Sequence, residues 1–145
     1  MNEPLYTVTI LRLAASIPHL GRLDRPQGRA ELRSPACGSM VTVEVALDAH
    51  GRIAAIGQEV QACAFGQACA ALMGAHAIGR DAPEIGDALS AFASWLDGTS
   101  TNPGDWPGLD ALEPARSRRG RHAAMLLPFR ALLAAIEQAE ERVAP

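Results

Sequence analysis

The stretch Val41–Val60, VTVEVALDAHGRIAAIGQEV, decides the fold of this sequence. Its first seven residues alternate between apolar and other side chains, the apolar set being Val41, Val43, Val45 and Leu47. This period of two, in a run rich in β-branched residues, predicts a strand with one buried face. Asp48-Ala49-His50-Gly51 supplies a turn, and residues 52–60 return as a second strand. The stretch therefore predicts an antiparallel β-hairpin.

Helical periodicity surrounds this hairpin on both sides. Apolar side chains that recur every three to four residues predict helices over residues 5–17, 68–79, 83–96 and 127–142. Pro18 ends the first helix, and Pro128 lies in the first turn of the last, where proline is tolerated. Further elements are a short edge strand over residues 29–34 and a loop over residues 98–108. We therefore expect residues 1–145 to form a single α+β domain, a small antiparallel sheet of about three strands packed with helices.

The composition narrows the class of protein. The chain has 145 residues, a net charge of −3 and no lysine, and 48% of its residues are hydrophobic. This length fits one domain with a sizeable core. An acidic chain lacks the general basic face that nucleic acid requires, so we expect no nucleic-acid partner. The wealth of alanine and arginine is typical of GC-rich bacterial coding.

The sequence also indicates a cellular compartment. The start, Met1-Asn2-Glu3-Pro4, lacks the basic residues and apolar run of a secretory signal. No stretch approaches the length needed to span a bilayer. We therefore expect a cytoplasmic protein with no membrane partner. In that reducing compartment its three cysteines are expected to be thiols or metal ligands rather than a disulfide framework.

Two of the cysteines flank the predicted hairpin. Cys37 precedes its first strand and Cys63 follows its second, so antiparallel pairing should bring them together at one end. Two thiolates there would make half of a zinc or iron site. The alternative is that both are small, buried apolar residues, which is what cysteine usually is. No phosphate-binding loop, nucleophile elbow or His-Glu-x-x-His motif is present, so the sequence predicts no enzyme.

The three cysteines are expected to differ in reactivity. Cys63 lies near the N-terminus of a predicted helix, where the dipole and free N–H groups favour a thiolate. Cys37 precedes a strand and lacks that help, so we expect Cys63 to be the better nucleophile and the sulfur acceptor. Cys69 lies inside the helix, and we expect it to face the core and react slowest.

Four segments together resemble one known family. They are Pro35-Ala36-Cys37-Gly38, Gly51-Arg52-Ile53, Ala62-Cys63-Ala64-Phe65-Gly66-Gln67-Ala68 and Leu127-Pro128-Phe129-Arg130-Ala131-Leu132. In order and spacing they are similar to the IscU, SufU and NifU iron–sulfur assembly scaffolds, and most similar to SufU. The resemblance implies a SufE/NifU-like fold and a scaffold or sulfur carrier rather than an enzyme. It also implies persulfide transfer from a cysteine desulfurase, a transient iron–sulfur cluster or Zn²⁺, and delivery to apo iron–sulfur acceptor proteins.

The chain departs from this family at two ligand positions. The family has an aspartate after the first Cys-Gly, and Ser39 stands there. The family's third cysteine falls at Ala124, counted back from Leu127. The histidine that precedes it in IscU-type members falls at Ala123, one residue after His122. The Leu-Pro-Pro-Val-Lys signal through which IscU binds its chaperone is also missing.

The resemblance leaves an incomplete ligand set. Cys37 and Cys63 match family ligands for a metal or cluster, and His122 and Cys69 are candidates to complete the shell. With half of the shell gone, we expect any bound zinc to be lost readily to a chelator or on mild acidification. The alternative function is a metal-free adaptor that binds a cysteine desulfurase or another assembly partner.

Two further features allow alternative readings. Arg116, Arg118, Arg119 and Arg121 make a basic run that is either a solvated loop or a docking patch for an acidic partner. Trp106 is either an anchor that packs its loop on the domain or an exposed partner contact.

Overall fold

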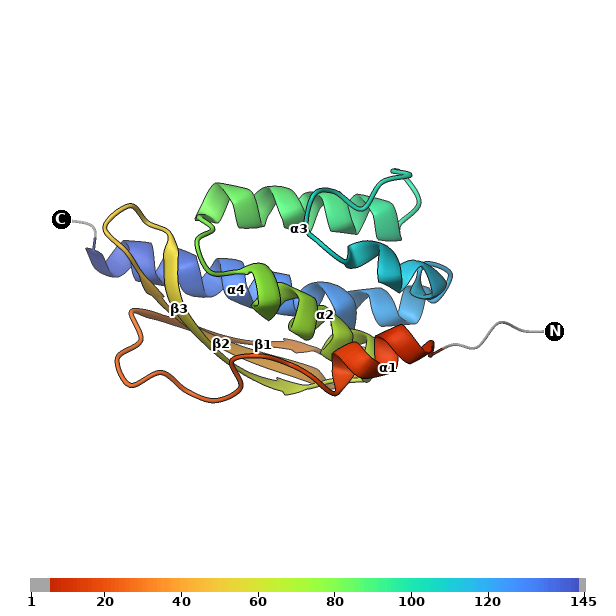
Figure 1. Ribbon diagram of the computed structural model, residues 1–145, viewed down its shortest axis with the longest axis horizontal. Coiled ribbons are helices and arrows are strands. Elements are labelled where there is room, and N and C mark those ends of the chain that lie inside the picture. The colour runs from red at the N-terminus through yellow and green to blue at the C-terminus, as the bar shows by residue number, and fades with distance from the viewer. Residues whose placement is uncertain (1–5, 144–145) are drawn as a thin grey trace.

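The computed structural model describes residues 6–143 and contains a three-stranded antiparallel sheet in the order β1-β2-β3 (Figure 1). The strands are β1 (Gly28–Ser34), β2 (Ser39–Leu47) and β3 (Ile53–Gln61). The predicted hairpin corresponds to β2 and β3, and the predicted edge strand to β1. The α+β fold class is thereby confirmed.

The helices cover one face of this sheet. They are α1 (Val8–Ala14), α2 (Ala64–His76), α3 (Ala82–Leu96) and α4 (His122–Val143). The long helix α4 packs along β1 and β2, while α2 and α3 pack against α4 (Figure 1). The core between these layers includes fully buried side chains from β2 and from the helices: Val41, Val43, Val45, Phe65, Phe92 and Phe129. The alternation of apolar residues in β2 therefore faces α4.

Capping residues in the sequence explain where two helices begin. Asp81 accepts a hydrogen bond from the N–H of Glu84, and the Glu84 side chain accepts one from the N–H of Asp81, which is a capping box for α3. Thr7 caps α1 by accepting from the N–H of Ile10 at 3.1 Å.

Several helix boundaries differ from the prediction. The first helix was expected from Leu5, which lies outside the described residues, and it ends at Ala14 rather than next to Pro18. The second begins at Ala64, four residues early. The last begins at His122, so Pro128 lies inside α4, where it removes the N–H that would bond to the Ala124 carbonyl.

The segment before α4 was expected to have no regular structure. It contains two 3-10 helices, η1 (Leu109–Ala115) and η2 (Arg119–Arg121). Such short turns have no strong periodic signal in sequence.

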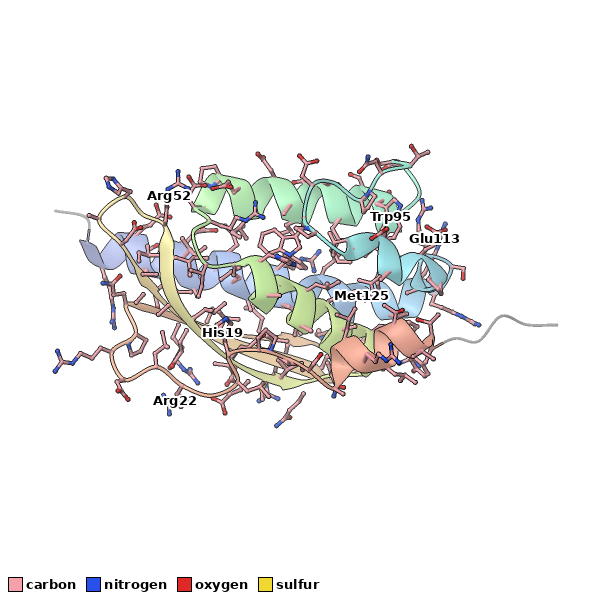
Figure 2. All side chains as sticks on the ribbon, viewed as in Figure 1. His19, Arg22, Arg52, Trp95, Glu113 and Met125 are labelled. Atoms are coloured by element: carbon pink, nitrogen blue, oxygen red, sulfur yellow. The ribbon has the colours of Figure 1, made fainter. Side chains whose placement is uncertain are left out.

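The loop over residues 20–27 covers the sheet face opposite α4 (Figures 1 and 2). The Glu44 side chain lies beneath it, only 3% exposed. Its Oε1 accepts from the N–H of Leu23 at 2.8 Å, and its Oε2 lies 3.5 Å from Arg22 and 3.4 Å from Arg29. These contacts give the buried carboxylate both a backbone donor and opposite charges.

The contact of β1 with α4 is close enough to require glycine. A Cβ at Gly28 would collide with the Ala135 carbonyl oxygen and lie 2.8 Å from the Ala139 nitrogen. We expect Gly28→Ala to lower the free energy of unfolding by about 2–3 kcal/mol, because the backbone must move apart. Gly86→Ala is the matched control, since nothing lies within 4 Å of its Cβ position. It should stabilise α3 slightly, and urea unfolding of both variants measures the difference. Equal stability of the two variants would contradict this close packing.

Candidate functional site

The register of the sheet determines where two of the cysteines lie. Met40 of β2 pairs with Gln61 of β3. Cys37 precedes Met40 by three residues, and Cys63 follows Gln61 by two. Both cysteines therefore lie at the same end of the sheet, as the hairpin predicted.

Cys37 lies in the tight turn that joins β1 to β2. Ser34 and Ser39 face each other as the last pair of this ladder. Gly38 has a φ of +73°, which favours glycine, and its N–H donates to the Ser34 carbonyl at 2.8 Å. The Cys37 side chain is exposed, and its Sγ donates to Ser39 Oγ at 3.1 Å. The Cys37 thiol is thus exposed to solvent, and two serines form hydrogen bonds with it.

The surroundings of Cys37 favour its thiolate. Hydrogen bonds with the side chains of Ser34 and Ser39 lower the pKa of Cys37 below its ordinary value, and the charge of Arg121 acts in the same direction. Cys37 has no helix N-terminus beside it, as expected, but the two serines supply a source of stabilisation that the sequence analysis did not foresee. Sequence reasoning missed Ser34 because strand pairing, which the local motif does not reveal, brings it to the turn.

The other two cysteines lie in and beside α2. Cys63 is the N-cap residue of α2 and is half-buried, but its side chain makes no capping hydrogen bond with the first turn. Cys69 is fully buried, and desolvation raises its pKa well above the ordinary value. The core position predicted for Cys69 is confirmed. Whether Cys63 accepts sulfur stays a prediction.

The two departures from the family pattern both lie next to these cysteines. Ser39 occupies the position beside Cys37 and offers a hydroxyl in place of a carboxylate. Ala124, at the position of the missing cysteine, is fully buried. It packs on the first turn of α2, because a Cβ at Gly66 would lie 3.6 Å from the Ala124 Cβ. The methyl side chain of Ala124 cannot coordinate a metal ion.

Among residues 6–143, no other side chain joins Cys37 and Cys63 in a metal shell. The His122 ring is turned to the end of η1, where its Nε2 lies 3.1 Å from the Ala115 carbonyl oxygen and 3.0 Å from that of Arg116. Within residues 6–143, no group of three or more His, Cys, Asp or Glu side chains is placed to hold a metal ion. Because zinc sites in proteins use three or four protein ligands, the residues present do not fit a zinc ion.

One arginine of the basic run, Arg116, makes hydrogen bonds and an ion pair within the domain, and the other three differ from it. Arg116 donates to the Trp95 carbonyl at 2.9 Å and to the Ser100 carbonyl at 3.2 Å, and it pairs with Glu113 at 3.3 Å (Figure 2). These hydrogen bonds and this ion pair tie the loop after α3 to η1; Figure 2 labels only Trp95 and Glu113 of the residues involved. The remaining three arginines make no ion pair within the part of the chain that the structure describes.

Trp106 is the loop anchor that one reading of the sequence predicted. Its side chain is 4% exposed and its Nε1 donates to the Leu72 carbonyl at 2.9 Å. The alternative, an exposed partner contact, is wrong.

No helix among the described residues is long and apolar enough to cross a membrane.

The fold and the two thiols together define a small α+β protein with paired cysteines at one end of an antiparallel sheet. The model of the NifU-like N-terminal domain family matches residues 5–93 of the chain. A solved NifU-like protein (N-terminal) from Brucella abortus is 34% identical, with a TM-score of 0.88 over 94% of this chain and 95% of that one. The chain therefore belongs to the NifU-like N-terminal domain family.

A second solved structure shares the fold. It is described as an iron–sulfur cluster assembly scaffold protein for the SUF system, from Fervidobacterium islandicum. It is 20% identical, with a TM-score of 0.83 over 91% of this chain and 96% of that one. No protein with a curated description matches the chain.

The hydrogen bonds at Cys37 predict a pH dependence. Because Ser39 stabilises the thiolate, Ser39→Ala should raise the pKa of Cys37 and move its alkylation profile to higher pH, with a slower rate below the midpoint. The measurement is the alkylation rate of each cysteine against pH, read by mass spectrometry. Ser90→Ala on the exposed face of α3 is the control and should change nothing. Cys69 should stay unlabelled in the folded protein. An unchanged Cys37 profile in Ser39→Ala would contradict the role of the serine.

Restoring the two absent ligands should restore a metal site. In Ser39→Asp/Ala124→Cys, two added ligands join Cys37 and Cys63 at the same end of the sheet. We expect this variant to retain about one zinc per chain in excess chelator, while the unmodified protein loses its zinc. The measurement is metal content after chelation, with thermal unfolding to verify that Ala124→Cys folds. If the variant retains no more zinc than the parent, the four positions do not converge. If the parent already retains zinc, His122 and Cys69 are the first ligands to test.

Proposed function

We propose that this chain is an iron–sulfur assembly protein that carries sulfur as a persulfide on Cys37, with a cysteine desulfurase as donor. The observation that carries the proposal is the exposed Cys37 thiol, held by two serines in a turn of the NifU-like fold. Membership of the NifU-like family supports the assembly role. The name of the SUF scaffold that shares the fold points to the same process.

The transfer is a thiol–persulfide exchange. The Cys37 thiolate attacks the outer sulfur of the donor's persulfide, the donor's S–S bond breaks, and a new S–S bond forms on Cys37. The donor cysteine leaves as a thiolate and takes up a proton, so no external oxidant or reductant is needed. In a second exchange of the same kind, a thiolate of an apo iron–sulfur acceptor protein attacks the outer sulfur of the Cys37 persulfide, and Cys37 leaves as a thiolate and takes up a proton. This chemistry suits the reducing cytoplasm, where thiols stay free.

The role of each residue follows from its place in the turn. Hydrogen bonds with Ser34 and Ser39 favour the thiolate of the attacking sulfur, and the charge of Arg121 favours the anion before and after transfer, because a persulfide is also acidic. Cys63 at the same end of the sheet is a second thiol that can accept the sulfur from Cys37. No step requires a metal ion, which accords with the ligand set present.

A metal-free adaptor is the second candidate function. The buried Ala124 favours it, because a scaffold that builds a cluster on its own thiols needs the ligand that is missing there. In that role the chain would bind the desulfurase without taking sulfur.

Mapping sulfur onto the three cysteines tests both candidates. After incubation of metal-free protein with a cysteine desulfurase and cysteine, we expect mass spectrometry to find one added sulfur, first on Cys37. Cys37→Ser should abolish most of this early loading, while Cys69→Ser, the control, should leave it unchanged. If loading starts on Cys63 and survives Cys37→Ser, the acceptor is Cys63, as the sequence predicted. If no cysteine gains sulfur, the adaptor function takes the place of the carrier.

A further inference from the structure

Three arginines of the basic run make no ion pair among residues 6–143. Arg118 and Arg119 are exposed and Arg121 is half-buried. The backbone that bears them is fixed, because the N–H of Arg118 donates to the Ala115 carbonyl at 3.0 Å and that of Arg121 to the Arg118 carbonyl at 2.9 Å. The run is therefore a defined cationic surface and not a free loop, in a chain whose net charge is −3.

Some negative charge lies near this run but does not neutralise it. The charge of Arg119 contributes to lowering the pKa of Asp97, after the hydrogen bonds of Thr99 to that carboxylate. No carboxylate oxygen comes within ion-pair distance of Arg118, Arg119 or Arg121 among residues 6–143. The surface thus stays cationic in the free protein.

An exposed apolar surface lies at the same end of the molecule as the arginines (Figure 1). Val8 and Leu11 of α1 are 63% and 49% exposed, although the opposite face of the same helix buries Ile10 completely. Arg12 shares their outward face, because residues four apart meet on a helix. The helix α1 contacts both α2 and η1, and Figure 1 places it at the same end of the molecule as the start of α4.

The basic run also reaches the reactive turn through Arg121. The charge of Arg121 acts directly on Cys37, and Cys63 caps α2, on which α1 packs. We use the name thiol-end surface for Val8, Leu11, Arg118 and Arg119. An apolar centre with a charged rim is the usual composition of a protein–protein contact, and uncompensated arginines select a partner of opposite charge.

We propose that the thiol-end surface docks an acidic face of the protein that exchanges sulfur with Cys37. This inference rests on the proposed function and adds the chemistry of the partner. In the docked state the partner's carboxylates would pair with Arg118 and Arg119, while apolar side chains cover Val8 and Leu11. The partner's persulfide, itself anionic, would then arrive beside Arg121 and the Cys37 thiol.

The two parts of the surface act on different steps of binding. Long-range attraction between the arginines and an acidic partner raises the association rate, and salt screens it over about 10 Å at 0.1 M ionic strength. Burial of Val8 and Leu11 slows dissociation, and salt screening does not weaken it. The two contributions can therefore be separated by experiment.

The test compares charge reversal on the thiol-end surface with the same change elsewhere. Arg118→Glu/Arg119→Glu is the test variant. Arg25→Glu/Arg142→Glu is the control, since both residues are exposed and Arg142 lies in the last turn of α4, about 30 Å along the helix from its start. Both variants change the net charge equally. The readout is the rate of persulfide loading on Cys37 from the cysteine desulfurase of the same cell, at low and high ionic strength.

We expect the test variant to lose at least about tenfold in loading rate at low salt, with the difference shrinking at high salt, and the control to match the parent. A third variant, Val8→Ser/Leu11→Ser, should weaken equilibrium binding to the desulfurase without changing the salt dependence of the rate. Equal rates for test and control variants, or a rate that rises on charge reversal, would overturn the acidic-partner proposal.

A small-molecule sulfur donor, which has no protein surface to dock, distinguishes the docking proposal from the carrier function on which it rests. At high ionic strength, which screens the charge of this small anionic donor, inorganic polysulfide should load sulfur onto Cys37 equally well in the parent and in all three variants. If polysulfide loads Cys37 but charge reversal has no effect with the desulfurase, the docking proposal fails and the carrier function stands. If neither donor loads Cys37, the carrier function itself fails.

Discussion

The antiparallel register between β2 and β3 is the constraint on which the rest of the structure depends. Val41, Val43 and Val45 are completely buried against α4 in this register. A shift of one residue would turn all three to the opposite face, so the core allows one pairing only. That pairing sets Met40 opposite Gln61 and thereby brings Cys37 and Cys63 to one end of the sheet. The burial that stabilises the fold thus also positions the thiols.

The two residues that depart from the family pattern, Ser39 and Ala124, fit into this arrangement. Ala124 is enclosed where α4 meets α2 at Gly66, and its methyl group fills the contact without strain. Ser39 replaces a carboxylate by a hydroxyl that hydrogen-bonds Cys37 within the protein. The three cysteines differ in their surroundings. Cys37 is exposed with stabilising donors, Cys63 is half-buried, and Cys69 is desolvated in the core.

The sheet could be predicted because its pattern is local. Alternation in β2, the Asp48–Gly51 turn and the return strand specify a hairpin without reference to the rest of the chain. The start of α4 could not be predicted in this way. Pro128 suggests that it lies in the first turn of the helix, whereas packing on β1 and β2 supports a longer helix that contains Pro128 in its interior. Packing of this kind often overrides local preference.

The candidate site was predictable only in part for the same reason. The positions of Cys37 and Cys63 follow from the hairpin alone. The stabilisation of Cys37 depends on Ser34, which reaches the turn through β1–β2 pairing, and on Arg121, which is 84 residues further along the chain. The orientation of the His122 ring towards η1 depends on a 3-10 helix with no clear sequence signal. Contacts between such distant segments are set by tertiary packing.

The central claim is that sulfur is carried on a thiol without a metal ion, and metal dependence of sulfur loading tests it most directly. The measurement is the amount of sulfur on each chain after reaction with a cysteine desulfurase and cysteine, with excess chelator and with added zinc. The account predicts equal loading in both conditions, because hydrogen bonds with Ser34 and Ser39 favour the Cys37 thiolate without a metal ion. Loading that occurs only with zinc, and disappears with chelator, would contradict it.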